Sequence, residues 1–490
     1  MEKWKRSLFF WLLVAAFFIT APAVILRARG YRFDFDRGVF VYSGSITIKS
    51  NPQNINVLLN GELNESKKLD RINNSSQISG LLPGEYDIKV TYPGFRTWDK
   101  KIPVRSGLST EFWNVLLVRE NYEKTPYAIK DLDRFFISPK NDLLATAKNT
   151  SDEQLNLNIL DLKDDVIVHS FSLPNLNLVD QEAKENIEWS PVKNLYLSIP
   201  VIEKSSNKKA EDNNKDYIIV NLDSEETFSL EDFLTNNSVE QVRWHPQKEN
   251  YLFFLSQNSL YRVNVTDSND IVSIAQDVAT YNLAGSYIYF SQLSNKIIYR
   301  KSIDKFDQEE QITNTFPADF QENINKIIIY DKDRIAILDK SNSLFIFNHG
   351  ARNDYFKKLD SAVEGLHFSD DGKKLLFWTK NEISVYFLRD WDVQPPRQEN
   401  EQLNLTRYIN PIENVQWFSD YEHVLFNSGP YVKIIELDSR DKRNSMDILT
   451  LDSTNYLFTL DASLEKLFFV DKEKELYSID FPEPTTFLGL

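Results

Sequence analysis

The chain has 490 residues, well beyond the roughly 150 that usually fill one domain, so a large core in more than one folded unit is expected. Its formal net charge of −16 should repel polyphosphates, which argues against nucleic acid as a partner. The lack of Cys excludes disulfides, thiolate metal sites and cysteine nucleophiles, and 13% aromatic residues favour strands over disorder.

An apolar run near the N-terminus predicts a transmembrane helix. Residues 8–26 read LFFWLLVAAFFITAPAVIL, and at about 1.5 Å per residue they span about 28 Å, close to the hydrocarbon thickness of a bilayer. Basic residues flank the run on both sides, so their number does not orient it. Residues 1–7 form only a short basic tail, and everything foldable follows the run. This layout indicates a signal anchor: a cytoplasmic tail, one span of the cell membrane and an extracytoplasmic remainder.

A cleaved signal peptide is the alternative, because Ala21, Pro22 and Ala23 resemble a small-residue cleavage site. The apolar run continues to Leu26 instead of stopping at that site, which favours the anchor. Residues 27–42, with several Arg and Asp, are expected to form a linker.

Residues 43–120 predict a small antiparallel β-sandwich. Ile46 and Ile48 alternate with polar residues, and a second run, 55–59, ends at the turn pair Asn60-Gly61. A third alternating run, 86–92, lies between two Pro-Gly turns. A further strand pair is expected at 98–104 and 110–118.

This segment resembles the PEGA domain. The resemblance rests on Asn51-Pro52, on 57–61, on Gly-Leu-Leu-Pro-Gly-Glu-Tyr at 80–86 and on 90–95 with Trp98 beyond. The family is named for Pro-Glu-Gly-Ala, and here Pro52-Gln53-Asn54-Ile55 stands in its place, keeping only the Pro. The resemblance implies a small β-sandwich of bacterial and archaeal surface proteins, generally extracytoplasmic, with no catalytic residues to carry over.

Residues 121–490 contain a recurring unit: a hydrophobic residue, Ser or His, Pro or Asp, a polar turn and an apolar strand. Degenerate copies lie at 285–290, 327–338 and 460–470. The clear copies begin at Ile137-Ser138-Pro139, Trp189-Ser190-Pro191, Trp244-His245-Pro246, Phe368-Ser369-Asp370 and Phe418-Ser419-Asp420.

About eight units with a period of about 45 residues and four short strands each predict a β-propeller of seven or eight blades, with eight favoured. The pattern resembles the WD40-like and TolB-like propellers, most closely at Ser369 to Lys373. The fold class is therefore all-β after the N-terminal helix, and the resemblance says little about a ligand. Polar insertions at 203–215 and 389–402 belong on loops at a propeller face, as solvated decoration or as recognition surface.

The five His do not form a metal-ligand pattern. His245 occupies the Ser position of the repeat, and His423 lies in the polar turn that follows that position. His367 precedes the Phe368 anchor, where Glu188 and Arg243 stand in other units. The remaining two, His169 and His349, lie in apparent loops.

The acidic clusters are interpreted as turns. Asp331-Lys332-Asp333 and Asp370-Asp371-Gly372 do not continue into a calcium loop, and Asp-Gly is the ordinary chemistry of a tight turn. No phosphate loop, nucleophile elbow or dinucleotide fingerprint is present in the sequence. We therefore expect no metal, no cofactor and no catalytic residue, and the sequence assigns no binding residue.

Charge is unevenly distributed: residues 1–42 carry +4, residues 43–120 carry +2, and residues 121–490 carry −22. The acidic propeller should stand away from anionic head groups. The sequence favours a membrane-anchored binding or scaffold protein of the bacterial cell envelope that presents a propeller face to a protein or a polysaccharide. Two alternatives stay open. A propeller glycan hydrolase or lyase predicts that titratable residues from three or more blades converge at one channel mouth, and the other alternative is a structural envelope spacer.

Overall fold

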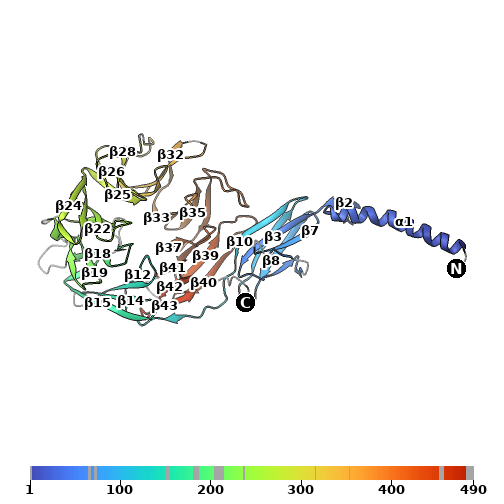
Figure 1. Ribbon diagram of the computed structural model, residues 1–490, viewed down its shortest axis with the longest axis horizontal. Coiled ribbons are helices and arrows are strands. Elements are labelled where there is room, and N and C mark those ends of the chain that lie inside the picture. Colours follow the sequence, from blue (N-terminus) through green and yellow to red (C-terminus); the bar gives the residue numbers. More distant parts are fainter. Residues whose placement is uncertain are drawn as a thin grey trace.

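The computed structural model describes residues 3–64, 68–70, 74–150, 154–179, 187–203, 215–234, 238–314, 316–352, 354–451 and 457–481. An apolar helix leads through a hairpin into a small domain of two sheets and then into a ring of sheets (Figure 1). The insertion predicted at 203–215 falls at 204–214 outside the described residues, so its role stays a prediction.

The N-terminal helix α1 runs from Lys3–Ala28 and extends past the predicted apolar run at both ends. Its segment Trp4–Ala28 has a mean hydropathy of 2.4, and none of its most apolar stretch is buried against the protein. Figure 1 shows α1 projecting away from the sheets. Among the described residues, this is the one helix that is long and apolar enough to cross a membrane.

A hairpin follows the helix, inside the segment 27–42 that was expected to be a linker. Its strands β1 (Tyr31–Asp34) and β2 (Val39–Tyr42) pair antiparallel. The chain then enters the small domain at β3.

Two four-stranded sheets form the small domain. Their inward-facing side chains, among them Ile46, Val57, Ile88 and Phe112, pack into one core. The Asn60-Gly61 turn is confirmed, since φ is 52° at Asn60 and 87° at Gly61. One sheet has the order β10 (Ser109–Leu116), β3 (Gly44–Asn51), β7 (Ser75–Leu81), β6 (Lys68–Asp70), and the other has the order β5 (Glu62–Leu63), β4 (Asn56–Leu59), β8 (Gly84–Thr91), β9 (Trp98–Val104).

The predicted pairing of the strands at 98–104 and 110–118 is wrong. Both strands exist as β9 and β10, but β9 pairs antiparallel with β8, whereas β10 pairs parallel with β3 in the other sheet. The chain crosses between the sheets at a turn that includes Gly107, which has φ of 73°. The alternation of apolar and polar residues shows only that each strand buries one face. Two neighbouring strands of one sheet and two strands of facing sheets have the same alternation, so the pattern does not decide which strands pair.

Eight sheets follow within the described residues. Six have four strands in chain order: β12 (Arg134–Ile137), β13 (Leu143–Asn149), β14 (Gln154–Asp161), β15 (Val166–Pro174); β21 (Glu240–Trp244), β22 (Tyr251–Ser256), β23 (Ser259–Asn264), β24 (Asp267–Ala275); β25 (Val278–Ala284), β26 (Tyr287–Gln292), β27 (Ile298–Ser302), β28 (Glu309–Gln311); β29 (Ile324–Asp331), β30 (Arg334–Asp339), β31 (Leu344–His349), β32 (Asp354–Asp360); β33 (Val363–Phe368), β34 (Lys374–Thr379), β35 (Glu382–Phe387), β36 (Gln402–Arg407); β37 (Ile412–Trp417), β38 (His423–Ser428), β39 (Tyr431–Glu436), β40 (Ser445–Thr450).

The other two sheets depart from this pattern. One has five strands and a short 3-10 helix: β16 (Leu176–Leu178), β17 (Glu188–Trp189), β18 (Tyr196–Glu203), β19 (Lys215–Asn221), β20 (Thr227–Ser229) and η2 (Leu230–Phe233). The last sheet joins distant parts of the chain, in the order β11 (Thr125–Pro126), β43 (Leu476–Asp480), β42 (Lys466–Val470), β41 (Phe458–Asp461). The pairing of β11 with β43 closes the ring, and the predicted β-propeller is confirmed.

Aromatic side chains link the first strands of successive sheets. The indole Nε1 of Trp189 donates to the carbonyl oxygen of Phe136 at 3.3 Å, and that of Trp244 donates to the carbonyl oxygen of Glu188 at 3.1 Å. Trp417 donates in the same way to the carbonyl oxygen of a residue on β33. The Trp of the repeat therefore fills the core between sheets and also satisfies a backbone acceptor of the preceding sheet.

Candidate functional site

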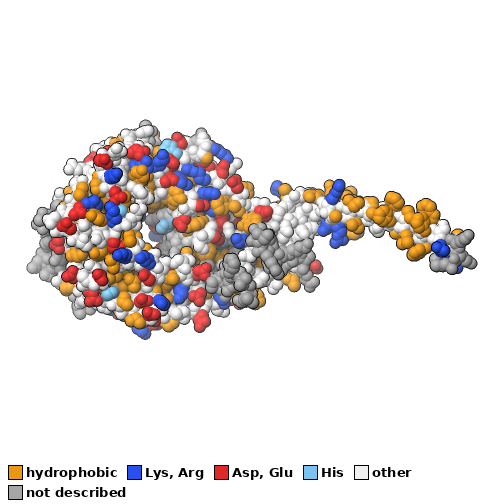
Figure 2. Space-filling model, in the orientation of Figure 1, with side chains coloured by type: hydrophobic (Ala, Val, Ile, Leu, Met, Phe, Trp, Pro, Cys, Tyr) orange, Lys and Arg blue, Asp and Glu red, His pale blue; other side chains and the backbone are white. Residues whose placement is uncertain are grey.

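The first strands of neighbouring sheets lie against one another, in the pairs β17 with β21, β21 with β25, β25 with β29, and β33 with β37. They are the innermost strands of the ring, and the surface is hollowed at its centre (Figure 2). We call this hollow the channel. Side chains of these strands are the ones that a ligand entering the ring would meet.

Four titratable residues from four different sheets gather along the channel: Glu188, Arg243, Lys326 and His367. Arg243 Nη1 lies 3.2 Å from Glu188 Oε2, and both side chains are half-buried. Arg243 and Lys326 line one small cavity together with Asn282. Burial, and next the charge of Arg243, lower the pKa of Lys326. Burial and the charge of Lys326 lower the pKa of His367.

Within the described part of the chain, the ammonium group of Lys326 has no ion pair or hydrogen bond. The ring of His367 stacks on Trp378, with centroids 5.6 Å apart and planes 19° apart. The carboxylate of Glu188 already pairs with Arg243, and the lowered pKa of His367 leaves its imidazole uncharged near neutral pH, so Arg243 and Lys326 are the basic groups that a ligand would meet. Such an excess of basic groups suits the recognition of an anionic group.

The composition of the channel also bears on the enzyme alternative. Titratable residues from more than three sheets do converge, as that alternative predicts. Glycoside hydrolases, however, generally use two carboxyl groups about 5–9.5 Å apart. The cluster supplies only Glu188, whose carboxylate is paired with Arg243. Its chemistry supports binding better than hydrolysis.

The other four His are tied into local structure. His245 takes the place of the repeat's Ser, as predicted. Its backbone N–H donates to the carbonyl oxygen of Tyr251 at 2.9 Å, and the backbone N–H of Ser190 donates to the carbonyl oxygen of Tyr196 at the same distance. His169 and His349 were predicted in loops but lie on β15 and β31. Their Nδ1 atoms approach Glu225 at 2.9 Å and Asp354 at 3.0 Å, respectively. Across the described ranges no group of three or more His, Asp or Glu is placed to hold a metal ion.

His423, predicted in a turn, begins β38 at the end of that turn and is buried. Its Nδ1 lies 2.7 Å from Asp420 Oδ2. Burial disfavours the charged imidazole, but the nearby carboxylates, Asp420 first and then Glu436 and Glu422, together outweigh it and raise the pKa of His423. Burial likewise disfavours the Asp420 carboxylate, but His423 and the backbone N–H groups of Glu422 and His423 together outweigh it and lower the pKa of Asp420. The pair is therefore a buried, charge-assisted clamp across one turn.

Replacing His423 with Asn is expected to destabilise the propeller most at mildly acidic pH. A pKa that is raised on folding gives stability that is complete below the unfolded value of about 6.5 and is lost as pH rises through the folded value. The difference in Tm between the parent chain and H423N should shrink between about pH 5.5 and 8.5, a range in which Asp420 stays ionised. Thermal unfolding over this range measures it, with His349→Asn at an exposed ion pair as the control. A difference that is constant with pH would contradict the assignment.

The acidic clusters form turns, as predicted. Asp331 Oδ1 accepts from Asp333 N at 2.9 Å, and Asp371 Oδ1 accepts from Lys373 N at 2.9 Å. Gly372, with φ of 63°, completes the second turn. These carboxylates are used to satisfy backbone N–H groups.

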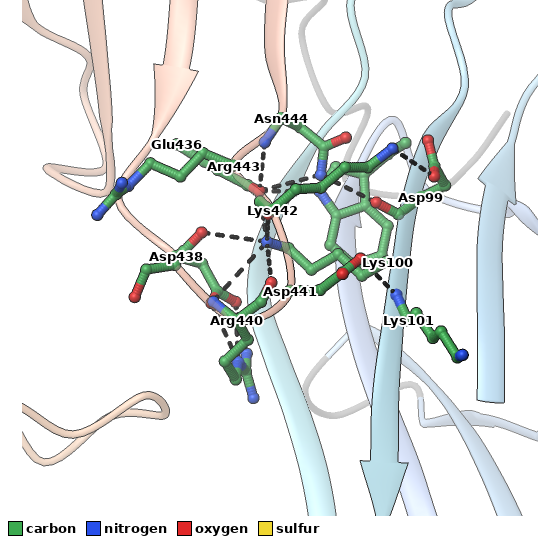
Figure 3. A network of polar contacts seen from close by, with 12 residues as sticks. Asp99, Lys100, Lys101, Glu436, Asp438, Arg440, Asp441, Lys442, Arg443 and Asn444 are labelled. Carbon is green, nitrogen blue, oxygen red and sulfur yellow. Dashed lines mark hydrogen bonds and ion pairs between the residues drawn. The ribbon is translucent and has the colours of Figure 1, made fainter. Parts of the chain in front are cut away.

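A buried lysine joins the small domain to the propeller (Figure 3). Lys100 on β9 is fully buried, and its Nζ lies 2.7 Å from Glu436 Oε1 at the end of β39. Nζ also donates to the carbonyl oxygens of Asp438 at 3.1 Å, Arg440 at 2.9 Å and Lys442. One side chain of the small domain thus holds a whole loop of the propeller, residues 436–444.

The partners of Lys100 are themselves satisfied. Glu436 Oε2 accepts from Trp98 Nε1 at 2.9 Å, and Glu436 Oε1 accepts from the backbone N of Asn444 at 2.7 Å. At the edge, Lys442 Nζ donates to Asp99 Oδ2 at 2.7 Å. A buried charge is tolerated only when it is paired and its remaining donors and acceptors are filled, and both conditions hold here.

The insertion at 389–402 lies against the small domain. Gln394 Oε1 accepts from Glu111 N at 3.1 Å, and Gln394 Nε2 donates to the carbonyl oxygen of Ser109 at 3.1 Å. Arg440 donates to the carbonyl oxygen of Glu111 at 2.8 Å and lies 4.2 Å from the ring centre of Phe112. This segment is part of the junction between the domains. It was expected to be either solvated decoration or a recognition surface on a propeller face, and neither expectation included this role.

Sequence reasoning did not identify this junction, although a signal was present. In the run Trp98–Val104 the buried positions alternate, and Lys100 stands at one of them. A charged residue at a core position of an edge strand calls for a buried partner from elsewhere.

Comparison with known proteins finds distant likenesses to solved structures. No family model matches the chain, and no curated protein matches its sequence. Among solved structures, the Dos1 propeller is 10% identical over 74% of this chain and 95% of its own, with a TM-score of 0.48. The β-propeller domain of Cps50 (Swd1) from Myceliophteria thermophila is 12% identical over 72% and 98%, with a TM-score of 0.41. A eukaryotic initiation factor is 13% identical over 68% and 92%, with a TM-score of 0.40. Likenesses this distant assign no family and no activity.

Proposed function

We propose that this protein is a membrane-anchored scaffold of the bacterial cell envelope. In this proposal α1 spans the cell membrane, the small domain is a PEGA-like sandwich, and the eight sheets are the blades of a propeller outside the cytoplasm. The propeller presents a face to a protein or a polysaccharide and has no catalytic activity. The observation that carries the proposal is the apolar helix, whose most apolar stretch is not buried against the described protein, while the two folded domains are locked together beyond it.

The channel gives the binding part of the proposal its chemistry. The propeller segment is acidic, with −22 over residues 121–490, yet the basic side chains Arg243 and Lys326 lie together where its sheets meet. Long-range repulsion by the acidic surface disfavours polyanions in general. A partner that offers a single carboxylate or other anionic group to the channel would still find Arg243 and Lys326. This arrangement favours a binding role over a purely structural spacer.

The lack of Cys allows a clean test of topology in cells. In the full chain, Asp164→Cys places a thiol on an exposed propeller turn, and Ser7→Cys places one before the apolar run while keeping the basic tail. A membrane-impermeant maleimide should label D164C in intact cells and S7C only after permeabilisation. In the same cells, a cross-linker should give discrete adducts that decrease several-fold in the double variant R243Q/K326Q. The exposed Arg407→Gln serves as the matched control and should leave the adducts unchanged.

Protection of D164C in intact cells would place the propeller in the cytoplasm and overturn the proposal. Recovery of the D164C variant as a soluble protein that lacks the N-terminal segment around Ser7 would show that the helix is a cleaved signal sequence. Adducts that are identical in R243Q/K326Q and in the parent chain would remove the channel as the binding site.

A further inference from the structure

The β1–β2 hairpin exposes an apolar surface directly beside the end of α1. Phe35 at its tip is 86% exposed, and Phe40 and Val39 are 46% and 48% exposed. The rings form one cluster, since Phe33 lies 5.0 Å from Phe35 and 5.1 Å from Phe40 between centroids. Clustered exposed aromatic residues are unusual on a water-facing surface and generally mark a binding surface.

The turn that presents Phe35 is well built. Asp34 is buried, and its Oδ1 accepts from the backbone N atoms of Asp36 and Arg37, each at 3.1 Å. Gly38, with φ of 66°, donates its N–H to the carbonyl oxygen of Asp34 at 2.8 Å. These bonds hold the tip in a defined turn with Phe35 pointing outward.

The base of the hairpin is fixed to both of its neighbours. Ser43 N and Oγ donate to the carbonyl oxygen of Gly30 at 2.9 and 2.6 Å, which closes the base of the hairpin. Arg32 Nη1 on β1 donates to the carbonyl oxygen of Arg27 at 3.3 Å, which ties the hairpin to the last turn of α1. Tyr42 packs against Gly107 of the small domain so closely that a Cβ there would lie 2.8 Å from its ring. The hairpin is therefore held in place between the helix and the small domain (Figure 1).

Basic side chains accompany the apolar surface. Arg27 and Arg29 end the helix region, and Arg32 and Arg37 lie on the hairpin; with Asp34 and Asp36 counted, residues 27–42 carry a net charge of +2. The side chain of Arg37 is mostly exposed, with Asp34 as its partner at 3.6 Å. Aromatic rings next to arginines match the interface of a bilayer, where rings lie among the upper acyl chains and guanidinium groups contact phosphates.

The length of α1 places the hairpin at that depth. Its 26 residues extend about 39 Å, more than the roughly 30 Å of a hydrocarbon core, so the end that carries Arg27 reaches the head groups. The hairpin begins three residues after the helix ends and is bonded to its last turn through Arg32. It therefore has to lie at or near the membrane surface if α1 spans the bilayer.

We propose that the β1–β2 hairpin is an interfacial anchor that inserts Phe33, Phe35 and Phe40 into the outer leaflet of a phospholipid bilayer. This inference rests on the proposed membrane span of α1. The occupant of the apolar surface is lipid, with the arginines at the phosphate level. The hairpin would then restrict rotation and tilting of the small domain on its helix.

The test uses full-length single-Cys variants labelled with an environment-sensitive fluorophore and reconstituted into vesicles of phosphatidylcholine and phosphatidylglycerol. Phe35→Cys reports on the hairpin, Ala15→Cys on the middle of α1, and Ile409→Cys on an apolar propeller residue that is 98% exposed. Lipids with a quencher on the acyl chain should quench the label at 15 strongly and at 35 substantially, and leave the label at 409 unchanged. Adding F33S and F40S to the F35C chain should at least halve the quenching at 35.

The controls separate the two levels of inference. If the label at 15 is quenched while the label at 35 behaves like that at 409, the hairpin inference is overturned and the membrane span stands. If the label at 15 is not quenched, the membrane span fails, and the hairpin inference fails with it. Quenching at 35 that F33S and F40S leave unchanged would also overturn the role of the aromatic cluster.

Discussion

Replacing Lys100 with Met is expected to separate the propeller from the small domain at a cost of about 3–5 kcal/mol, the usual penalty for breaking a buried ion pair from one side. Met fills a similar volume but leaves Glu436 buried without its cation, and three backbone carbonyl oxygens lose their shared donor. Calorimetry of the full chain should show one cooperative transition in the parent split into two in K100M. Limited proteolysis should then cut within residues 436–444.

The neighbouring lysine provides the control. Lys101 has an exposed side chain and an exposed partner, Glu85, at 3.2 Å. Such surface pairs contribute about 0–1 kcal/mol, so Lys101→Met should unfold like the parent. Equal effects of K100M and K101M would show that the buried network does not hold the domains together.

The second large effect is expected at Gly365, where substitution by Ala should destabilise the propeller by about 1–3 kcal/mol through overpacking. Gly365 on β33 faces Trp378 on β34 in the strand register. A Cβ at this position would lie 2.0 Å from Cζ2 of Trp378, so the indole has to move. Because Trp378 stacks on His367, the shift would also disturb the channel cluster. Chemical denaturation measures the free energy of unfolding. The cross-linking assay described above for R243Q/K326Q, applied to G365A, reports on binding at the channel.

Gly84 is the matched control for this substitution. It also lies on a strand, has no positive φ, and an added Cβ there would meet nothing within 4 Å. Gly84→Ala should therefore be close to neutral. The further change Trp378→Phe in the G365A background should recover part of the loss by making room for the methyl group. If G365A were as stable as G84A, the close packing of Gly365 on Trp378 would be refuted.

Local features of the fold were predictable because they depend on neighbouring residues. The alternation in 86–92 predicted β8, and the Asn60-Gly61 and Asp370-Asp371-Gly372 turns formed where the backbone needs positive φ. The repeated Ser or His before Pro or Asp predicted the sheets of the propeller, because in four of the five clear copies its backbone N–H makes the same bond at the end of a first strand. In the fifth copy Phe418 makes this bond in place of Ser419, so the predicted repeat is shifted there by one residue.

Long-range features were not predictable in the same way. Whether β9 and β10 share a sheet depends on which side of the core the chain takes after Gly107, and alternation is silent on that choice. The repeat placed His367 at the same position of its unit as Glu188 and Arg243 in theirs. Three of the four residues of the channel cluster could therefore be aligned from the sequence. That Lys326 joins them follows only from how the ring brings its sheets together.

The pairing of β11 with β43 has a consequence for biogenesis. The strand at Thr125–Pro126 finds its partner at Leu476–Asp480, so the first propeller strand has to wait until some 350 further residues have been made. During that interval the growing sheets stay open at both ends, each with a bare edge that invites pairing with other chains. A nascent chain stalled before Leu476 would therefore be prone to aggregate, and chaperones that cover exposed strand edges would act in that window.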